Sequence, residues 1–165
     1  MKQDPVKTFI ESYAERAGLA RHRNIDKTPR LYYLCGAISK DPYAYFKFSF
    51  AETYLKAKGN LVINPLRSAG LEVCWTDALA ADLDILARLK AIYLDTCYIM
   101  GKCDGIRLPA VITIDPPERR FDSPGSALER EFVRNVLPII ETSSRYNKMF
   151  LAALEEYVTK KGESR

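Results

Sequence analysis

Two short apolar runs with a helix-patterned segment between them constrain the fold of this chain more than any other feature. The first run, residues 31–35, reads Leu-Tyr-Tyr-Leu-Cys, and the second, residues 61–63, reads Leu-Val-Ile. Continuous apolar runs of this length are typical of parallel strands buried on both faces. Between them, Asp41-Pro42 marks the start of a helix and Gly59 marks its end. This order predicts a βαβ unit, which requires a parallel sheet with a right-handed crossover.

The intervening helix also shows which side faces the core and where a ligand would bind. The side chains predicted to face the core are Phe46, Phe50, Tyr54 and Leu55, and those predicted to face solvent are Lys47, Glu52, Lys56 and Lys58. In parallel sheets of this kind, ligands bind beyond the carboxyl ends of the strands. The turn at residues 36–39 and the Asn64-Pro65 pair each follow one of the two strands. We therefore expect these two turns to lie beside one another at the candidate site.

The rest of the chain extends this pattern and leaves one region open. Residues 5–18 predict a helix that packs on the body of the protein or on a second subunit, and residues 19–30 a polar linker. Residues 1–30 thus form an N-terminal helical extension and linker, and residues 31–165 form the main domain. Residues 137–140 predict a last strand and 146–160 a last helix.

The open region is the stretch between the second strand and residue 122. Either residues 75–89 are a helix and both 91–94 and 110–114 are strands, or residues 75–100 form one long helix and only 110–114 is a strand. We favour two strands. The fold class predicted in this way is α/β, a three-layer sandwich with a mainly parallel sheet of about five strands.

Composition and charge exclude several classes of protein. No apolar stretch approaches a membrane span, and the N-terminus does not read as a signal peptide, so we expect a cytoplasmic protein with no membrane partner. The net charge of +4 comes from scattered basic residues, which suits a small anionic substrate better than a nucleic acid polymer. The cysteines lack metal-binding spacing, and the single histidine lies in a polar stretch. We therefore predict no metal site and no cofactor.

The stretch Asp122-Ser-Pro-Gly-Ser-Ala-Leu-Glu129 is the strongest candidate for a functional turn. Ser123 is a candidate N-cap with Pro124 at the first helical position, and Ser126 with Glu129 is a second possible capping box. In either arrangement Glu129 falls in the first turns of a helix, where the helix dipole stabilises a carboxylate. Taken alone, the stretch is better explained by a capping carboxylate than by a catalytic one.

Four pieces in order along the chain resemble the nucleoside 2-deoxyribosyltransferase-like superfamily, which includes deoxyribosyltransferases and 2'-deoxynucleoside 5'-phosphate N-hydrolases. The pieces are the first strand with its turn at Gly36, the second strand ending at Asn64, the segment around Asp82, and the Gly125 to Glu129 element. The resemblance implies a Rossmann- or flavodoxin-like α/β/α fold and, by analogy only, a homo-oligomer. It also implies that Glu129 is the nucleophile and that Asp82 orients the substrate or protonates the departing base.

The implied activity is cleavage or transfer at the N-glycosidic bond of a 2'-deoxynucleoside or its 5'-monophosphate through a covalent deoxyribosyl-enzyme. If residues 75–100 are one helix, Asp95 takes the role of Asp82. Arg119 or Arg120 together with Ser123 would hold a 5'-phosphate. The remaining substrate-binding candidates are Gly36, Ser39, Tyr33, Asn64, Ser123 and Gly125.

Two alternatives and one expectation about mobility remain open at this point. One alternative is a purely hydrolytic deoxynucleotide N-glycosidase, which the phosphate-binding residues would favour. The other is a non-catalytic nucleotide-binding module, which is favoured by Lys90, because the superfamily usually has a second Asp there. We also expect residues 115–122 to form a mobile lid over the site.

Overall fold

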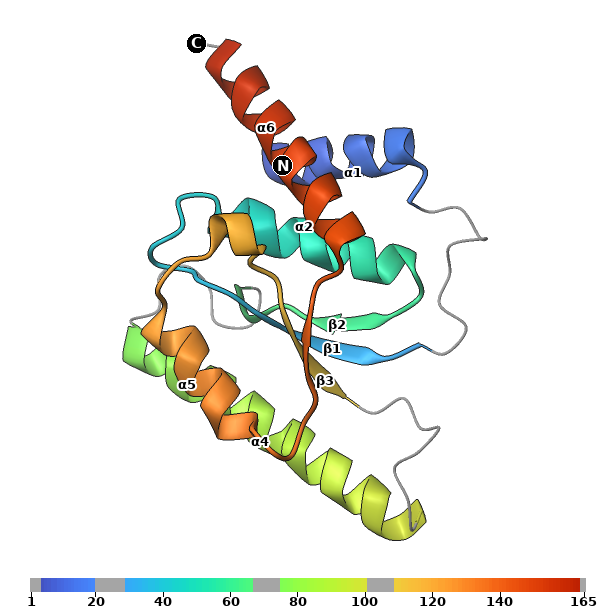
Figure 1. Cartoon of the computed structure of the whole chain (residues 1–165), viewed down its shortest axis with the longest axis vertical. Helices are drawn as coiled ribbons and strands as arrows, with labels where there is room; N and C mark the ends of the chain where they lie inside the picture. Colours follow the sequence, from blue (N-terminus) through green and yellow to red (C-terminus); the bar gives the residue numbers. More distant parts are fainter. Residues whose placement is uncertain (1–3, 20–28, 67–74, 101–108, 164–165) are drawn as a thin grey trace.

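The computed structural model describes residues 4–19, 29–66, 75–100 and 109–163, and these form a parallel sheet with helices on both faces (Figure 1). The sheet has four strands in the order β2-β1-β3-β4, and every neighbouring pair is parallel. The strands are β1 (Leu31–Cys35), β2 (Leu61–Ile63), β3 (Ala110–Thr113) and β4 (Ile139–Glu141). The predicted three-layer α/β architecture is therefore confirmed, and the fold is consistent with a Rossmann-like arrangement.

The helices divide into two layers. On one face of the sheet lie α1 (Pro5–Ala17), α2 (Ala44–Ala57) and α6 (Ser144–Glu163), and on the other lie α4 (Trp75–Met100) and α5 (Pro124–Val133) (Figure 1). Because successive side chains of a strand point to opposite faces, β1 contributes to both cores. Tyr32 and Leu34 pack with the first layer, whereas Tyr33 and Cys35 pack with Leu86, Val133 and their neighbours in the second.

The prediction of a fifth strand was wrong, because residues 91–94 belong to α4. Of this apolar run only Tyr93 packs against the core that holds Leu86 and Leu89, whereas Ile92 and Leu94 are about half exposed on the helix. A short apolar run does not distinguish a strand from a buried turn of helix. The favoured assignment therefore fails, and the alternative, a single helix followed by the strand β3, is confirmed.

The N-terminal helix is part of the first layer. Asp4 caps α1 by accepting hydrogen bonds from the N–H groups of Val6 and Lys7. Ile10 is buried in the core, and the ring of Phe9 lies against those of Phe46 and Tyr157. Residues of α1 thus complete the layer formed by α2 and α6. The apolar face of α1 packs on the body of the protein, one of the two expected arrangements.

The assignment of faces on α2 needs a correction. The predicted core residues Phe46 and Phe50 are buried, but so are Lys47 and Glu52, which we expected to face solvent. Periodicity places a charged residue outside by default, yet a buried charge is tolerated where partners from other elements surround it. Both side chains have such partners, and those of Lys47 lie at the candidate site.

The carboxyl ends of β1 and β3 meet at a topological switch point. The chain leaves β1 through α2 towards β2 on one side, and it returns through α4 to β3 on the other. Cys35 and Thr113, the last residues of these two strands, are register partners. Both α4 and α5 begin at this same edge (Figure 1). Of the helices described, none combines the length and apolar character needed to cross a lipid bilayer.

Candidate active site

Glu129 is buried in α5, close to the carboxyl end of β1. The helix begins as predicted, with Ser123 as N-cap and Pro124 in the first turn, and the Ser123 hydroxyl accepts a hydrogen bond from the N–H of Ser126 at 3.3 Å. Ser126 also lies against β1, because its carbonyl accepts a contact from the Cys35 thiol at 3.7 Å. Glu129 is only 6% exposed. Ser123 rather than Ser126 is thus the cap, and Glu129 does not face solvent as a capping carboxylate normally does.

Asp82 and Tyr33 join Glu129 in the layer between the sheet and α4. Asp82 is 4% exposed and Tyr33 is fully buried. The Oδ1 atom of Asp82 has no hydrogen-bond partner, and the Tyr33 hydroxyl faces the Glu129 carboxyl group without forming a hydrogen bond of good geometry. Buried polar atoms without partners are rare and call for an explanation, of which a catalytic role is one. We refer to Asp82 and Glu129 as the acid pair, and Tyr33 is the tyrosine beside it.

Burial perturbs the pKa of each member of this group. The pKa of Glu129 is raised to about 8, first by burial and then by the charge of Asp82. The pKa of Asp82 is raised to about 6 by burial, although its interaction with Glu129 opposes the rise. Burial and the two carboxyl groups also raise the pKa of Tyr33. At neutral pH the acid pair therefore holds one proton between its two carboxyl groups, which is the arrangement of an acid and a base in many catalytic sites.

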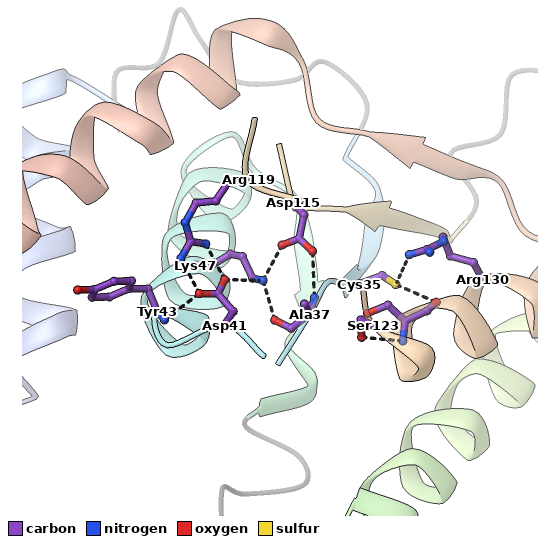
Figure 2. Close-up of polar contacts among 10 residues, drawn as sticks. Cys35, Ala37, Asp41, Tyr43, Lys47, Asp115, Arg119, Ser123 and Arg130 are labelled. Atoms are coloured by element: carbon purple, nitrogen blue, oxygen red, sulfur yellow. Dashed lines mark hydrogen bonds and ion pairs between the residues drawn. The ribbon is translucent and has the colours of Figure 1, made fainter. Parts of the chain in front are cut away.

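A second polar group, built around Lys47, occupies the other side of the β1 end (Figure 2). The fully buried Lys47 Nζ lies 2.9 Å from Asp41, 2.5 Å from Asp115 and 2.6 Å from the carbonyl of Ala37. Asp115 accepts a hydrogen bond from the Ala37 N–H at 3.0 Å. Both main-chain groups of Ala37 are thereby held, and the turn after β1 is fixed. We call Asp41, Lys47, Asp115 and Arg119 the lysine cluster.

Arg119 completes the lysine cluster. Its guanidinium donates two hydrogen bonds of 2.6 Å to the carboxylate of Asp41. Burial of Asp41 opposes its ionisation, but the hydrogen bonds from Arg119 and Lys47 prevail and lower its pKa to about 2. Charges of opposite sign are matched throughout this cluster, in contrast to the acid pair.

Of the remaining predicted site residues, Gly36 and Asn64 are buried, whereas Ser39 and Gly125 are at least partly exposed. Gly36 lies at the end of β1, where an added Cβ would come within 3.0 Å of Ile114, so its role is close packing as well as position. Asn64 is buried, but its amide groups are used within the protein: the NH₂ donates to Glu52 at 3.1 Å and the carbonyl accepts from the N–H of Leu66. Ser39 is exposed, and Gly125 is partly exposed in the first turn of α5.

Asp95 does not lie with the acid pair. It is exposed and lies about 20 Å further along α4 than Asp82, since an α-helix rises about 1.5 Å per residue. The long helix therefore exists, yet Asp82 rather than Asp95 is the aspartate next to Glu129. Lys90, on the same helix, donates to the carbonyl of Phe132 at 2.9 Å and thus ties α4 to α5.

Contacts of residues 115–122 argue against the predicted lid. Asp115 is held by Lys47 and Ala37, the segment forms a 3-10 helix η2 at Pro117–Arg119, and Arg119 is bound to Asp41. Arg120 pairs with Glu141 at 3.0 Å. Both arginines are thus paired with carboxylates in this conformation, and the hydroxyl of Ser123 is used as a cap.

Sequence reasoning missed Lys47, Asp41, Asp115, Cys35 and Arg130. The position of Asp41 at a helix start and of Asp115 directly after a strand was the one signal in the sequence that linked them to the carboxyl edge. Burial raises the pKa of the Cys35 thiol to about 12, and the charge of Glu129 adds to that rise. Arg130 lies 3.9 Å from the Cys35 sulfur. Within the described ranges, no three His, Cys, Asp or Glu side chains gather as the ligands of a metal ion would.

No protein-family model, curated protein or solved structure matches the chain.

Proposed function

We propose that this protein cleaves or transfers at the N-glycosidic bond of a 2'-deoxynucleoside or its 5'-monophosphate, with Glu129 as nucleophile. The observation that carries the proposal is the acid pair, two buried carboxyl groups that share a proton, with the Tyr33 hydroxyl facing Glu129. Buried acids with strongly perturbed pKa values gather at functional sites, because catalysis needs groups poised near neutral pH. The two helices that carry the pair, α4 and α5, also begin at the switch-point edge of the parallel sheet, where ligands of such folds bind.

The pair supplies the two groups that glycosidic chemistry requires. The Glu129 carboxylate attacks C1' as the bond from C1' to the base nitrogen breaks, and the shared proton goes from Asp82 to the departing base. The resulting ester between Glu129 and the deoxyribose is then attacked at C1' by water or by another base. Asp82 takes up the proton of that second nucleophile, which frees Glu129 and restores the shared proton.

Proton placement within the pair is the step on which this scheme depends. With the higher pKa, Glu129 holds the shared proton when no ligand is bound. For Glu129 to attack, the proton has to pass to Asp82, which its contact with Glu129 allows. The positive charge of Arg130 lowers the pKa of Glu129 and so favours this transfer. The Tyr33 hydroxyl is placed to donate to the carboxylate that results.

Base release is the measurement that tests the proposal. The protein is incubated with each of the common 2'-deoxynucleosides and their 5'-monophosphates, with and without an acceptor base, and the free base is followed by chromatography. Release without acceptor identifies a hydrolase, and exchange with acceptor identifies a transferase. Glu129→Gln should lower turnover by several powers of ten, since an amide cannot form the ester.

Glu131→Gln is the matched control, because Glu131 is an exposed glutamate on the same helix that pairs with Arg134. Its turnover should equal that of the wild type. Equal base release by Glu129→Gln and wild type would remove Glu129 from the mechanism. Tight binding of a deoxynucleotide by a wild-type protein that releases no base would replace the proposal with a non-catalytic binding module.

A further inference from the structure

Among the residues that the structure describes, the basic side chains near the candidate active site are, with one exception, bound to oxygen atoms of the protein. Lys47 lies between two aspartates, Arg119 forks onto Asp41, Arg120 pairs with Glu141 and Lys90 caps a carbonyl of α5. Arg130 is the exception. Its one hydrogen bond in the described structure goes to the sulfur of Cys35 at 3.9 Å.

This contact leaves most of the hydrogen-bonding capacity of Arg130 unused. A guanidinium has five N–H donors in a planar fork, and a thiol sulfur is a weak acceptor. Arg130 is also partly buried, so that protein atoms displace some of the water that would otherwise solvate its charge. A charge in such a place is costly unless an anion or strong acceptors compensate it. The attraction of the acid pair offsets part of that cost without occupying the donors of the fork.

The position of Arg130 suits an anion that belongs to a ligand. Side chains of an α-helix tilt towards its N-terminus, and the Arg130 side chain accordingly reaches Cys35 at the carboxyl end of β1 (Figure 2). The Cys35 thiol in turn contacts the Ser126 carbonyl in the first turn of α5. The guanidinium thus lies next to the start of α5, one residue along the helix from Glu129. A ligand that reaches Glu129 with one end can reach Arg130 with another.

We propose that Arg130 binds the phosphate of a phosphomonoester ligand whose reacting sugar carbon lies at Glu129. This inference rests on the proposed function, and it selects the 5'-monophosphate over the nucleoside as substrate. A phosphate fits a guanidinium because two of its oxygens accept the two parallel N–H groups of the fork. Arg130 therefore takes the phosphate-binding role that the sequence suggested for Arg119 or Arg120. The guanidinium groups of those two residues are bound to carboxylates, whereas that of Arg130 is not.

Binding measurements on the full chain test the proposal without requiring turnover. Isothermal titration calorimetry is carried out with inorganic phosphate, the four 2'-deoxynucleoside 5'-monophosphates and the four matching deoxynucleosides. We expect at least one monophosphate to bind the wild type more tightly than its nucleoside. Arg130→Gln should weaken that monophosphate by about 10- to 100-fold, the range for a charge-assisted hydrogen bond, and leave the nucleoside unchanged.

Two further variants separate loss of the fork from loss of charge or of folding. Arg134→Gln removes the same charge from the same helix, where Arg134 pairs with the exposed Glu131, and should bind like the wild type. Arg130→Lys keeps the charge but not the fork, so its affinity should fall between those of the wild type and Arg130→Gln. If Arg130→Gln does not fold, the comparison of Arg130→Lys with Arg134→Gln carries the test.

The possible outcomes distinguish this inference from the proposed function. Equal affinity of the wild type for nucleosides and monophosphates, or equal losses in Arg130→Gln and Arg134→Gln, would overturn the role of Arg130 even if bases are released. Binding of monophosphates that depends on Arg130, with no base release, would support the phosphate site and overturn the glycosidic reaction. Binding of inorganic phosphate alone, with no preference among the nucleotides, would contradict a phosphomonoester ligand.

Discussion

The lysine cluster and the acid pair lie on opposite sides of the same strand end, and they handle buried charge in opposite ways. In the lysine cluster, Lys47 and Arg119 face Asp41 and Asp115 at hydrogen-bonding distance. In the acid pair, Asp82 and Glu129 face each other, and the nearest described cation, Arg130, is bound to a sulfur. One cluster is electrostatically complete without a ligand, and the other is not.

This difference separates a structural role from a functional one. A compensated cluster holds the backbone, here both main-chain groups of Ala37. An uncompensated pair costs folding free energy, because its burial favours the neutral forms. Sites that spend stability in this way are where reactive groups are expected. This contrast supports the proposed chemistry at Glu129 and a structural role for Lys47.

Removal of Lys47 should have the largest effect on stability. Lys47→Met leaves Asp41 and Asp115 buried without their shared cation and frees the carbonyl of Ala37. We expect the free energy of unfolding, measured by urea denaturation, to fall by about 3 to 5 kcal/mol. Lys7→Met is the control, since Lys7 forms a pair with Glu11 on α1 in which both side chains are exposed, and it should change stability by about 0.5 kcal/mol or less. Equal effects of the two substitutions would contradict the structural role of the lysine cluster.

The pH dependence of stability should have opposite signs in the two clusters. The pKa of Glu129 is raised to about 8, so its contribution is fully present below its unfolded value and is lost as the pH rises through 8. Glu129→Gln cannot ionise, and its stability relative to the wild type should therefore increase between pH 5 and pH 9, by on the order of 3 kcal/mol. Urea denaturation across this range gives the difference directly.

Acid conditions test the other cluster. Because the pKa of Asp41 is lowered to about 2, its contribution is present above the unfolded value and is lost as the pH falls towards 2. Asp41→Asn should accordingly lie furthest below the wild type near neutral pH and approach it in acid. Glu131→Gln, which removes an exposed carboxylate, should show neither trend. A flat difference between Glu129→Gln and wild type from pH 5 to 9 would mean that Glu129 ionises normally.

The sequence predicts the features that depend on local pattern and misses those that depend on contacts between distant residues. The strand at residues 31–35, the βαβ unit and the helix start at Ser123 depend on local pattern, and all were predicted correctly. The pairing of Asp82 with Glu129 was reached through a family resemblance rather than from spacing. The lysine cluster could not be predicted, because periodicity places Lys47 on the solvent side. The burial of Lys47 depends on Asp115, which is distant in sequence and lies close because α2 crosses over the sheet.

The close packing of Gly36 gives a smaller effect that links the lysine cluster to the turn. In Gly36→Ala the new Cβ would lie 3.0 Å from Ile114 Cγ1 and 3.3 Å from Asp115 Oδ1. The turn has to shift to relieve these contacts, which should cost about 1 to 3 kcal/mol of unfolding free energy. Gly162→Ala is the control, because a Cβ there meets no atom within 4 Å and alanine favours a helix. Thermal denaturation should show a lower midpoint for the first variant and an equal or higher one for the second.

The smallest expected effect distinguishes the two buried tyrosines whose hydroxyl groups lack a partner. Tyr33 lies beside the acid pair, and Tyr146 lies across the sheet, packed against Tyr54 and Phe150. Removal of a buried hydroxyl that makes no hydrogen bond of good geometry costs little, so Tyr33→Phe and Tyr146→Phe should each change the free energy of unfolding by about 1 kcal/mol or less.

Activity should separate the two variants that stability does not. In Tyr33→Phe the ionised carboxylate of the pair loses its nearest neutral donor, and base release should fall by roughly tenfold, the effect of one hydrogen bond of about 1.4 kcal/mol. Tyr146→Phe should release base at the wild-type rate, since its hydroxyl is remote from Glu129. An equal loss of activity in both variants would assign the effect to packing of the sheet, and unchanged activity in both would leave Glu129 and Asp82 to act without the tyrosine.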